Sequence, residues 1–258
     1  MRTILLIGIG AGDPQQLTLQ AIDAIKRADV FLLVDKGEAK RELVDLRRAL
    51  LDTHRPDGGY QVAEIDDPPR DRAPGDYQHA VTDWHARRAA IFAETIAATV
   101  PEHATGAFLV WGDPTLYDSI LRILELVQHG GRIDLEVDVI PGITSIQALA
   151  ARHRIPLNRI GEPIHITTGR QLAQGLPPGV TNAVVMLDAH HGYTALEERE
   201  PGAWNIWWGA NLGTRTEQLI AGPIADAAPA IGRARETARE AAGWVMDTYL
   251  VRRADAAG

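Results

Sequence analysis

The chain has 258 residues, of which 45% are hydrophobic, and it contains no cysteine. Its 34 acidic and 26 basic residues give a formal net charge of −8, so the field of the whole molecule disfavours nucleic acid and anionic membranes as partners. The lack of cysteine excludes disulfides, thiolate zinc sites and cysteine nucleophiles, and it fits a reducing compartment.

No apolar run reaches the length of a membrane span, and the N-terminal run is too short for a signal peptide. We therefore expect a cytoplasmic protein. The length suits either one large α/β domain or two smaller domains that share an interface.

In the first half, short apolar runs alternate with longer amphipathic segments, which is typical of helices covering a mostly parallel sheet. The pattern predicts strands at residues 3–9, 30–34, 60–65, 107–111 and 135–140. It predicts helices at residues 17–27, 38–51, 77–98, 116–128 and 143–151. The span 66–76 is rich in proline and charge and is predicted to be an exposed loop.

In the second half, Pro156 and Pro163 interrupt the helical periodicity, and we place a domain boundary there. The prediction is an N-terminal α/β domain at residues 1–152 with a mostly parallel sheet and a C-terminal α/β domain at residues 153–258 with a mixed sheet. The second domain has predicted strands at 164–167, 183–187, 206–209 and 244–251 and predicted helices at 194–199 and 226–241.

The first strand ends in the sequence IGIGAGDP, residues 7–14. A dinucleotide-binding loop needs the spacing G-x-G-x-x-G, but Asp13 or Gln15 falls at the third glycine position, depending on the register. We also expect Asp13 at the start of the following helix, where its charge would repel a phosphate. A neutral or cationic ligand suits this loop better, and a plain tight turn is the other interpretation. A nicotinamide-dependent oxidoreductase with Asp35 bound to the ribose stays as an alternative from another class.

Three unusual turns follow predicted strands: residues 8–14, residues 111–117 (WGDPTLY) and residues 141–145 (PGITS). Ligands of open α/β sheets bind at the carboxyl ends of the strands, so we expect these turns to converge on one crevice. Each turn taken alone also has a structural explanation, because Gly-Asp-Pro and Pro-Gly are common turn sequences.

Together, in this order, the turns resemble those of the tetrapyrrole (corrin and porphyrin) methylases, a family that uses S-adenosylmethionine. The first family motif, G-x-G-x-G-D-P-x-x-L-T, is matched by Gly8, Gly10, Gly12, Asp13, Pro14, Leu17 and Thr18. The family's G-D-P and P-G-[IV]-[ST]-[SA] turns are matched by Gly112, Asp113, Pro114, Pro141, Gly142, Ile143, Thr144 and Ser145. Family members often carry proline where this chain has Ala11, which bears on the shape of the loop and not on its location.

The resemblance implies two α/β domains of the class III S-adenosylmethionine-dependent methyltransferase type, with the active site in the cleft between them, no metal and a homodimer. The implied cofactor contacts, mostly through backbone groups, are Ala11, Trp111, Gly112, Asp113, Leu116, Thr144, Ser145, Leu187 and Gly213.

Three further segments, FLLVDKGEAKRELVDLRR, PIHITTGRQL and WWGANLGTRTEQLIAG, are most similar to one branch of this family. In that branch, precorrin-5 is methylated at C-1 and loses its acetyl group as acetate. A sibling methylase acting on another precorrin, on a diphthamide precursor or on ribosomal RNA remains an alternative, as does a binding module without catalysis.

Precorrin-5 is a polycarboxylate macrocycle, so an acidic chain needs local cations to bind it, and arginine suits carboxylates because it can bond them bidentately. Cations follow the second predicted strand and lie near the predicted junction: Lys36, Lys40, Arg41, Arg152, Arg154, Arg159 and Arg170. The substrate-binding prediction comprises Gly10, Gly12, Asp13, Lys36, Lys40, Arg154 and Arg170. Arg47 and Arg48 are instead expected on a solvated helix face.

Methyl transfer from a sulfonium needs alignment rather than a nucleophilic side chain. Loss of the acetyl group would also need a general base for water and a donor to the developing oxyanion. The candidates are Asp13, Asp35, Asp113, Tyr117 and His85, and each of them has an alternative role in capping, turn formation or a structural hydrogen bond. The sequence does not choose among them.

Two clusters have structural explanations. Adjacent His190 and His191 are not expected to share a metal ion without other ligands. The tryptophans Trp204, Trp207 and Trp208 are expected to pack in the core or between subunits, and they are a candidate dimer contact.

Overall fold

The computed structural model describes residues 1–35, 41–68 and 77–254, with the backbone alone for Asp35, Arg41, Glu42 and residues 77–81. The chain forms two compact units. The first comprises Met1–Gly10 and Pro14–Ile143, and the second comprises Ala11–Asp13 and Thr144–Gly258. No helix in the described part of the chain is long and apolar enough to cross a membrane.

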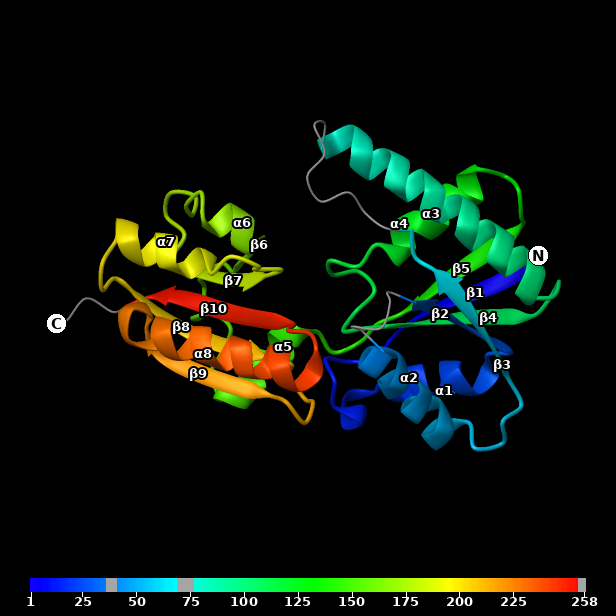
Figure 1. Ribbon diagram of the computed structural model, residues 1–258, viewed down its shortest axis with the longest axis horizontal. Helices are drawn as coiled ribbons and strands as arrows, with labels where there is room; N and C mark the ends of the chain where they lie inside the picture. Colours follow the sequence, from blue (N-terminus) through cyan, green and yellow to red (C-terminus); the bar gives the residue numbers. More distant parts are fainter. Residues whose placement is uncertain (36–40, 69–76, 255–258) are drawn as a thin grey trace. The chain divides into compact units, whose positions relative to one another are not determined.

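The first unit contains a five-stranded parallel sheet in the order β3-β2-β4-β1-β5 (Figure 1). Its strands are β1 (Arg2–Gly8), β2 (Val30–Asp35), β3 (Gln61–Asp66), β4 (Thr105–Val110) and β5 (Leu135–Ile140). Its helices are η1 (Pro14–Gln16), α1 (Leu19–Arg27), α2 (Arg41–His54), α3 (Tyr77–Thr99) and α4 (Ile120–His129). The parallel sheet predicted from the alternating pattern is therefore confirmed.

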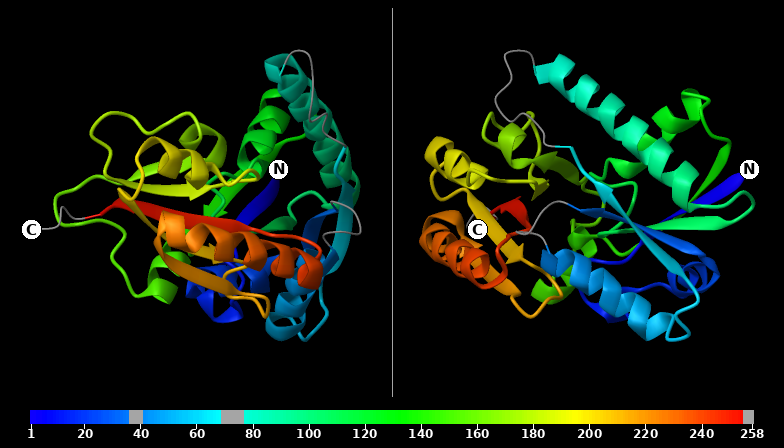
Figure 2. Two further views of the ribbon diagram at one scale, coloured as in Figure 1. Left: turned by 60° about the vertical axis from the view of Figure 1, so that its left-hand side comes forward. Right: turned by 45° about the vertical axis from the view of Figure 1, so that its right-hand side comes forward.

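Helices cover both faces of this sheet, with α1 and α2 on one side and α3 and α4 on the other (Figures 1 and 2). In β1, Leu5 and Ile7 belong to the cluster with α1 and α2, whereas Ile4 and Leu6 belong to the cluster with α3 and α4. All four side chains are at most 1% exposed. A strand buried on both faces carries apolar residues on both, which explains the continuous apolar run of residues 4–7 in β1.

The second unit has a five-stranded mixed sheet in the order β6-β7-β10-β8-β9. Only the β6–β7 pair is parallel among these neighbours. Its strands are β6 (His165–Thr168), β7 (Asn182–Met186), β8 (Trp204–Ala210), β9 (Gln218–Pro223) and β10 (Asp247–Arg253). Its helices are α5 (Ser145–His153), α6 (Gly169–Leu172), α7 (Gly192–Arg199) and α8 (Ile224–Ala242).

The tryptophans of β8 are divided between the two faces of this sheet. Trp204 and Trp208 are 2% and 0% exposed and pack in the core with α7 and α8, while Trp207 lies between them on the strand and under the Arg252 guanidinium, 5.3 Å away. Because alternate strand residues point to opposite faces, Trp204 and Trp208 face the interior of the unit. Of the two predicted roles, packing in the core is therefore confirmed for Trp204 and Trp208, and a contact between subunits does not fit them.

The chain passes between the units at residues 143–144 rather than at the predicted 152–153. Helix α5 packs against β8, β9 and β10 of the second sheet, so the nearby prolines mark the end of this helix and not the end of a domain. Strand β9 and the short α6 were not predicted. The residues of β9 alternate between partly buried and exposed at the edge of the sheet, and such a strand gives a weak apolar signal.

Candidate functional site

Three glycines meet where β1, β4 and β5 end. An added Cβ atom on Gly8 would lie 2.5 Å from the nitrogen of Gly142, and one on Gly142 would overlap the carbonyl oxygen of Gly112. Gly112 also exchanges backbone hydrogen bonds with Gly10, of 2.8 and 3.3 Å. The three turns of the first unit therefore meet, and their main chains approach so closely that only glycine fits.

Asp113 fastens two of these turns together. One carboxylate oxygen accepts bonds from the amide and the hydroxyl of Thr115, at 2.8 and 2.5 Å, and the other accepts a 2.9 Å bond from the amide of Gly142. Burial raises the pKa of this carboxyl, but the hydrogen bonds from Thr115 and Gly142 outweigh it, so the pKa ends below its ordinary value. With three donors on its oxygens, Asp113 is a structural clamp, and a role as general base does not fit.

The third turn leads into α5 in the second unit. Thr144 caps this helix, accepting a 3.2 Å bond from the amide of Ile146, and its hydroxyl contacts Gln147. The Ser145 hydroxyl accepts a 3.0 Å bond from Thr248 of β10. Both hydroxyls have structural partners, so a ligand at this helix end would be bound chiefly by the main chain.

The first turn contributes Asp13 to the second unit, where it lies beside Gly213. An added Cβ atom on Gly213 would lie 2.5 Å from the nitrogen of Asp13. Arg152 links the two segments, since its guanidinium lies 3.7 Å from the Asp13 carboxylate and 3.0 Å from Glu217. The Glu217 carboxylate also accepts a 2.7 Å bond from the amide of Gly213. Asp13 and Gly213, two predicted site residues from distant segments of the sequence, are thus neighbours.

The predicted place of Asp13 at the start of a helix is wrong. Helix α1 begins at Leu19, and its N-cap is Thr18, whose hydroxyl accepts a 3.0 Å bond from Ala21. Asp13 precedes the short η1 turn instead. The electrostatic argument against phosphate fails at this position, while the glycine spacing still argues against a dinucleotide loop.

The other predicted cofactor residues differ in exposure and in backbone conformation. Leu187 follows β7 with a φ of 54° and a side chain that is 64% exposed. Leu116 donates a backbone bond to Asp113, and its neighbour Tyr117 has a φ of 53° and is 45% exposed. Trp111 is partly buried and Ala11 is buried.

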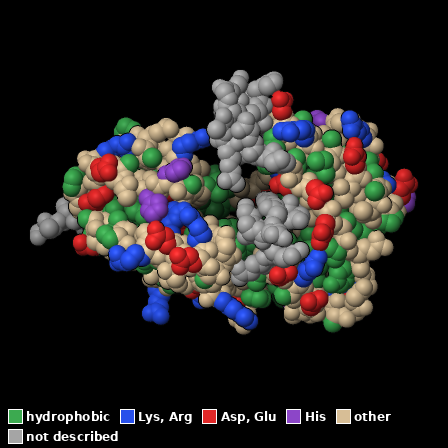
Figure 3. Space-filling view, in the orientation of Figure 1, with side chains coloured by type: hydrophobic (Ala, Val, Ile, Leu, Met, Phe, Trp, Pro, Cys, Tyr) green, Lys and Arg blue, Asp and Glu red, His purple; other side chains and the backbone are tan. Residues whose placement is uncertain are grey.

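The remaining candidates lie on other elements than these turns or outside the described side chains. His85 lines a groove of about 400 Å³ between α3 and α4. Arg154 is the exposed, left-handed C-cap of α5, and Arg170 lies exposed on α6. Asp35 is described only in its backbone, at the end of β2, and Lys36 and Lys40 lie outside the described residues. On the face shown in Figure 3, basic and acidic side chains are interspersed over the described surface of each unit.

Arg47 is not on a solvated face, contrary to the prediction. Its Nε donates to the carbonyl of Leu109 and its Nη1 to that of Leu43, both at 2.8 Å. Burial lowers its pKa to about 10, partly offset by Asp118. Arg48 does lie at the surface, 2.9 Å from Glu64.

Sequence reasoning missed a buried polar network in the second unit, built from Asp188, Arg235, Asp247 and Tyr249. A signal for it was present: Arg235 continues the row of buried positions Ile224, Ala227, Ile231 and Ala238 on α8, where the helical period calls for an apolar residue. The exposed His190 and the half-buried His191 border this network. Within the described residues, no group of three or more histidine, aspartate or glutamate side chains is arranged to hold a metal.

The chain belongs to the Tetrapyrrole (Corrin/Porphyrin) Methylases, which it matches over residues 3–228. It is thus an α/β enzyme of a methyltransferase family. It is 45% identical to a precorrin-6A synthase [deacetylating] of Sinorhizobium sp, over 98% of this chain and 96% of that protein.

Two solved structures extend the comparison. A putative cobalamin synthesis related protein (CobF) from Corynebacterium diphtheriae aligns with a TM-score of 0.83 and 42% identity, covering 99% of this chain and 100% of that one. A uroporphyrin-III C-methyl transferase from Thermus thermophilus, complexed with S-adenyl homocysteine, aligns with a TM-score of 0.57 and 20% identity over 97% of each chain. The second likeness concerns the fold alone.

Proposed function

We propose that this chain is an S-adenosylmethionine-dependent C-methyltransferase of cobalamin biosynthesis. It methylates precorrin-5 at C-1 and releases the acetyl group as acetate, which gives precorrin-6A. The observation that carries the proposal is the similarity to the Sinorhizobium enzyme over nearly the whole of both chains. The close approach of the three glycine-containing turns at the strand ends is consistent with this proposal.

The methyl donor is proposed to bind mostly through main-chain groups. Gly10, Gly112 and Gly213 have φ values of 79°, 69° and 76°, so at these positions a side chain would be strained and the main chain carries none. We assign donor contacts to Ala11, Trp111, Gly112, Asp113, Leu116, Thr144, Ser145, Leu187 and Gly213. When bound, S-adenosylmethionine supplies a methyl group activated by its sulfonium charge.

The chain's own contribution to methyl transfer is alignment. The Asp113 carboxylate holds the second and third turns at a fixed separation through its bonds to Thr115 and Gly142. Rigid orientation of reactants can lower a barrier by about 7 kcal/mol. The close backbone packing of Gly8, Gly112 and Gly142 and the hydrogen bonds of Asp113 support such rigid orientation.

Release of acetate has separate requirements. Water adds to the acetyl carbonyl, the bond to the ring carbon breaks, acetate leaves, and the electron pair left on that carbon takes up the methyl group. A general base must accept the proton of the water. Asp13 and Tyr117 are the preferred candidates because both belong to the turns, whereas the Asp113 oxygens are occupied and His85 lines the α3–α4 groove.

The substrate carboxylates are proposed to contact Lys36, Lys40, Arg154 and Arg170, and the ring to lie against Gly10, Gly12 and Asp13. Neutralising Arg170 with Arg170→Gln should weaken binding of the macrocycle and leave the affinity for S-adenosylhomocysteine unchanged. Equal losses of both affinities in calorimetry would contradict this assignment.

The test of the proposal is incubation with precorrin-5 and a labelled methyl donor. One methyl group gained and one acetate released per turnover is the expected result. Methylation without acetate would assign the chain to a sibling activity of the family. Titration with S-adenosylhomocysteine and, separately, NADH checks the disfavoured oxidoreductase alternative. The homodimer and the cytoplasmic location also stand as proposals, and light scattering of the purified protein tests the first.

A further inference from the structure

Leu187 combines two unfavourable features. It is a non-glycine residue in the left-handed region, with a φ of 54°, and its apolar side chain is 64% exposed. A backbone of this kind persists only where the surrounding structure imposes it, and such positions concentrate at binding sites. The question is which contacts impose this conformation.

The next residue, Asp188, is 4% exposed and fully bonded. Its carboxylate accepts bonds from the amides of His190 and Gly192, at 3.0 and 2.7 Å, and from the hydroxyl of Tyr249, at 2.6 Å. An added Cβ atom on Gly169 would overlap this carboxylate. The Asp188 side chain is therefore closely packed, and both of its carboxylate oxygens already accept hydrogen bonds.

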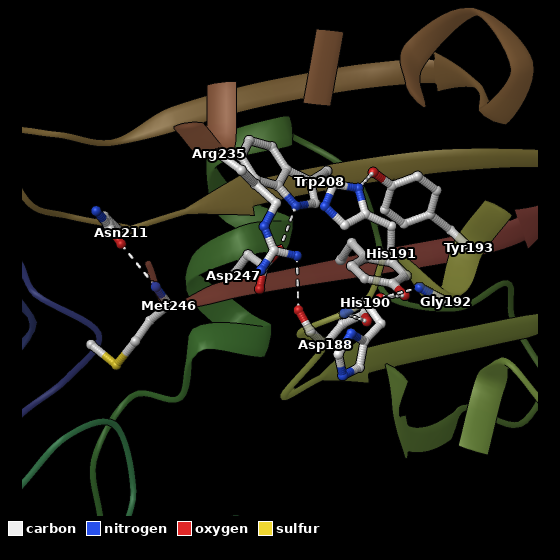
Figure 4. A network of polar contacts seen from close by, with 11 residues as sticks. Asp188, His190, His191, Gly192, Tyr193, Trp208, Asn211, Arg235, Met246 and Asp247 are labelled. Atoms are coloured by element: carbon white, nitrogen blue, oxygen red, sulfur yellow. Dashed lines mark hydrogen bonds and ion pairs between the residues drawn. The ribbon is translucent and has the colours of Figure 1, made fainter. Parts of the chain in front are cut away.

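Arg235 holds the main chain of the same residue. It reaches from α8, and its Nη1 donates a 2.8 Å bond to the carbonyl of Asp188, as Figure 4 shows. The same nitrogen lies 3.1 Å from the Asp247 carboxylate, which also accepts a 3.0 Å bond from the Trp208 indole. Helix α8 and strands β8 and β10 thus together fix the peptide between Asp188 and Ala189, one residue beyond Leu187.

A buried ionic network of this kind stabilises a core at a large cost in desolvation free energy. The Arg235 and Asp247 side chains are 7% and 5% exposed, and Arg235 Nε has no hydrogen-bond partner. A buried ion pair often stabilises no better than well-packed apolar residues, since desolvation offsets the attraction. The network of Arg235, Asp188 and Asp247 is better explained by a role in positioning the backbone beside Leu187 than by a role in stability alone.

We propose that Arg235 and Asp188 are positioning residues that hold Leu187 in its left-handed, exposed conformation and thereby present its side chain to the methyl donor. Arg235 acts through Leu187 and does not itself touch the ligand. This inference rests on the proposed function, because it takes Leu187 as a contact of the donor.

The test is a double-mutant cycle on S-adenosylhomocysteine affinity, measured by calorimetry. Arg235→Met keeps an unbranched apolar stem and removes the guanidinium donors, and it should weaken binding roughly tenfold. Arg235→Lys should restore part of the affinity. In a Leu187→Ala background, Arg235→Met should cause no further loss, because the side chain that Arg235 positions is already gone. General destabilisation would instead add to the effect of Leu187→Ala.

The matched control is Arg233→Met, the same substitution at an exposed position of α8, which should leave the affinity unchanged. If Arg235→Met does not fold, Tyr249→Phe decides, since it removes only the hydroxyl on Asp188 and should weaken binding in the same direction. Wild-type affinity in a folded Arg235→Met or Tyr249→Phe protein, or additive losses in the cycle, would overturn the inference. A wild-type chain that does not bind S-adenosylhomocysteine would instead overturn the proposed function.

Discussion

Gly213 and Asp13 lie against each other although 200 residues separate them in the sequence: an added Cβ atom on Gly213 would lie 2.5 Å from the Asp13 nitrogen. The contact brings the first glycine-rich turn against the loop between β8 and β9. Gly213 also has a φ of 76°, so the position excludes a side chain on two independent grounds.

Gly213→Ala should therefore destabilise the protein more than an ordinary glycine replacement. The left-handed backbone costs an alanine about 1 to 2 kcal/mol, and displacing Asp13 adds about 1 to 3 kcal/mol. Gly179→Ala is the matched control, because its φ is 81° and nothing lies within 4 Å of the added Cβ. Urea denaturation of both variants measures the difference, and equal losses would refute the contact.

Asp113→Asn should lower the free energy of unfolding by about 2 to 3 kcal/mol, since an amide cannot accept from all three donors of Thr115 and Gly142. The pKa of Asp113 is lowered in the folded state, so its ionised form stabilises the fold. That contribution is full above the unfolded-state pKa of about 3.9 and is lost as the pH falls through the lower folded-state value. The unfolding curves of wild type and Asp113→Asn should converge below about pH 4. A constant gap across this range would contradict the clamp.

The same substitution should affect stability unequally at two adjacent arginines. Arg47→Met leaves the carbonyl of Leu109 without its donor and should cost about 2 kcal/mol. Arg48→Met removes only a surface ion pair with Glu64 and should change stability by less than about 0.5 kcal/mol. Thermal and urea unfolding of the two variants provide the comparison. Similar losses for both would mean that Arg47 is not held as described.

His191 should make stability depend on pH near neutrality. Burial, with Arg235 as the next cause, lowers the pKa of His191, and its Nδ1 lies 2.7 Å from the Tyr193 hydroxyl. The unfolded chain then binds the proton more readily, so stability should fall as the pH drops from the unfolded pKa of about 6.5 toward the lower folded value.

His191→Asn tests this dependence, because asparagine tolerates the φ of 58° and does not titrate here. Its unfolding free energy should vary less than that of wild type between pH 7 and the folded pKa, and the exposed neighbour in His190→Asn serves as control. A steeper dependence in His191→Asn than in wild type would reverse the assignment.

Local patterns determined most of the architecture. The buried residues of β1 between positions 4 and 7 are apolar because helices cover both faces of the strand. The glycines at positions 8, 10 and 12, with Leu17 and Thr18, mark the turn that follows. The sequences of these turns also indicated the family, and the family match over residues 3–228 confirms it. Parallel strands end at one edge of a sheet, so the sequence predicted that the turns with Gly8, Gly112 and Gly142 would converge, and these glycines do meet.

Only the tertiary structure decided the partners of polar side chains. Arg47 and Arg48 are neighbours in the same helix, yet one bonds a buried carbonyl and the other a surface carboxylate. Asp113 was a candidate base until its three donors were located, and Arg235 was an unremarked residue in an alanine-rich helix until Asp188 and Asp247 were found around it. Apolar burial follows a periodicity that the sequence displays, whereas a hydrogen bond joins atoms from distant segments, and the distance between those atoms exists only once the chain has folded.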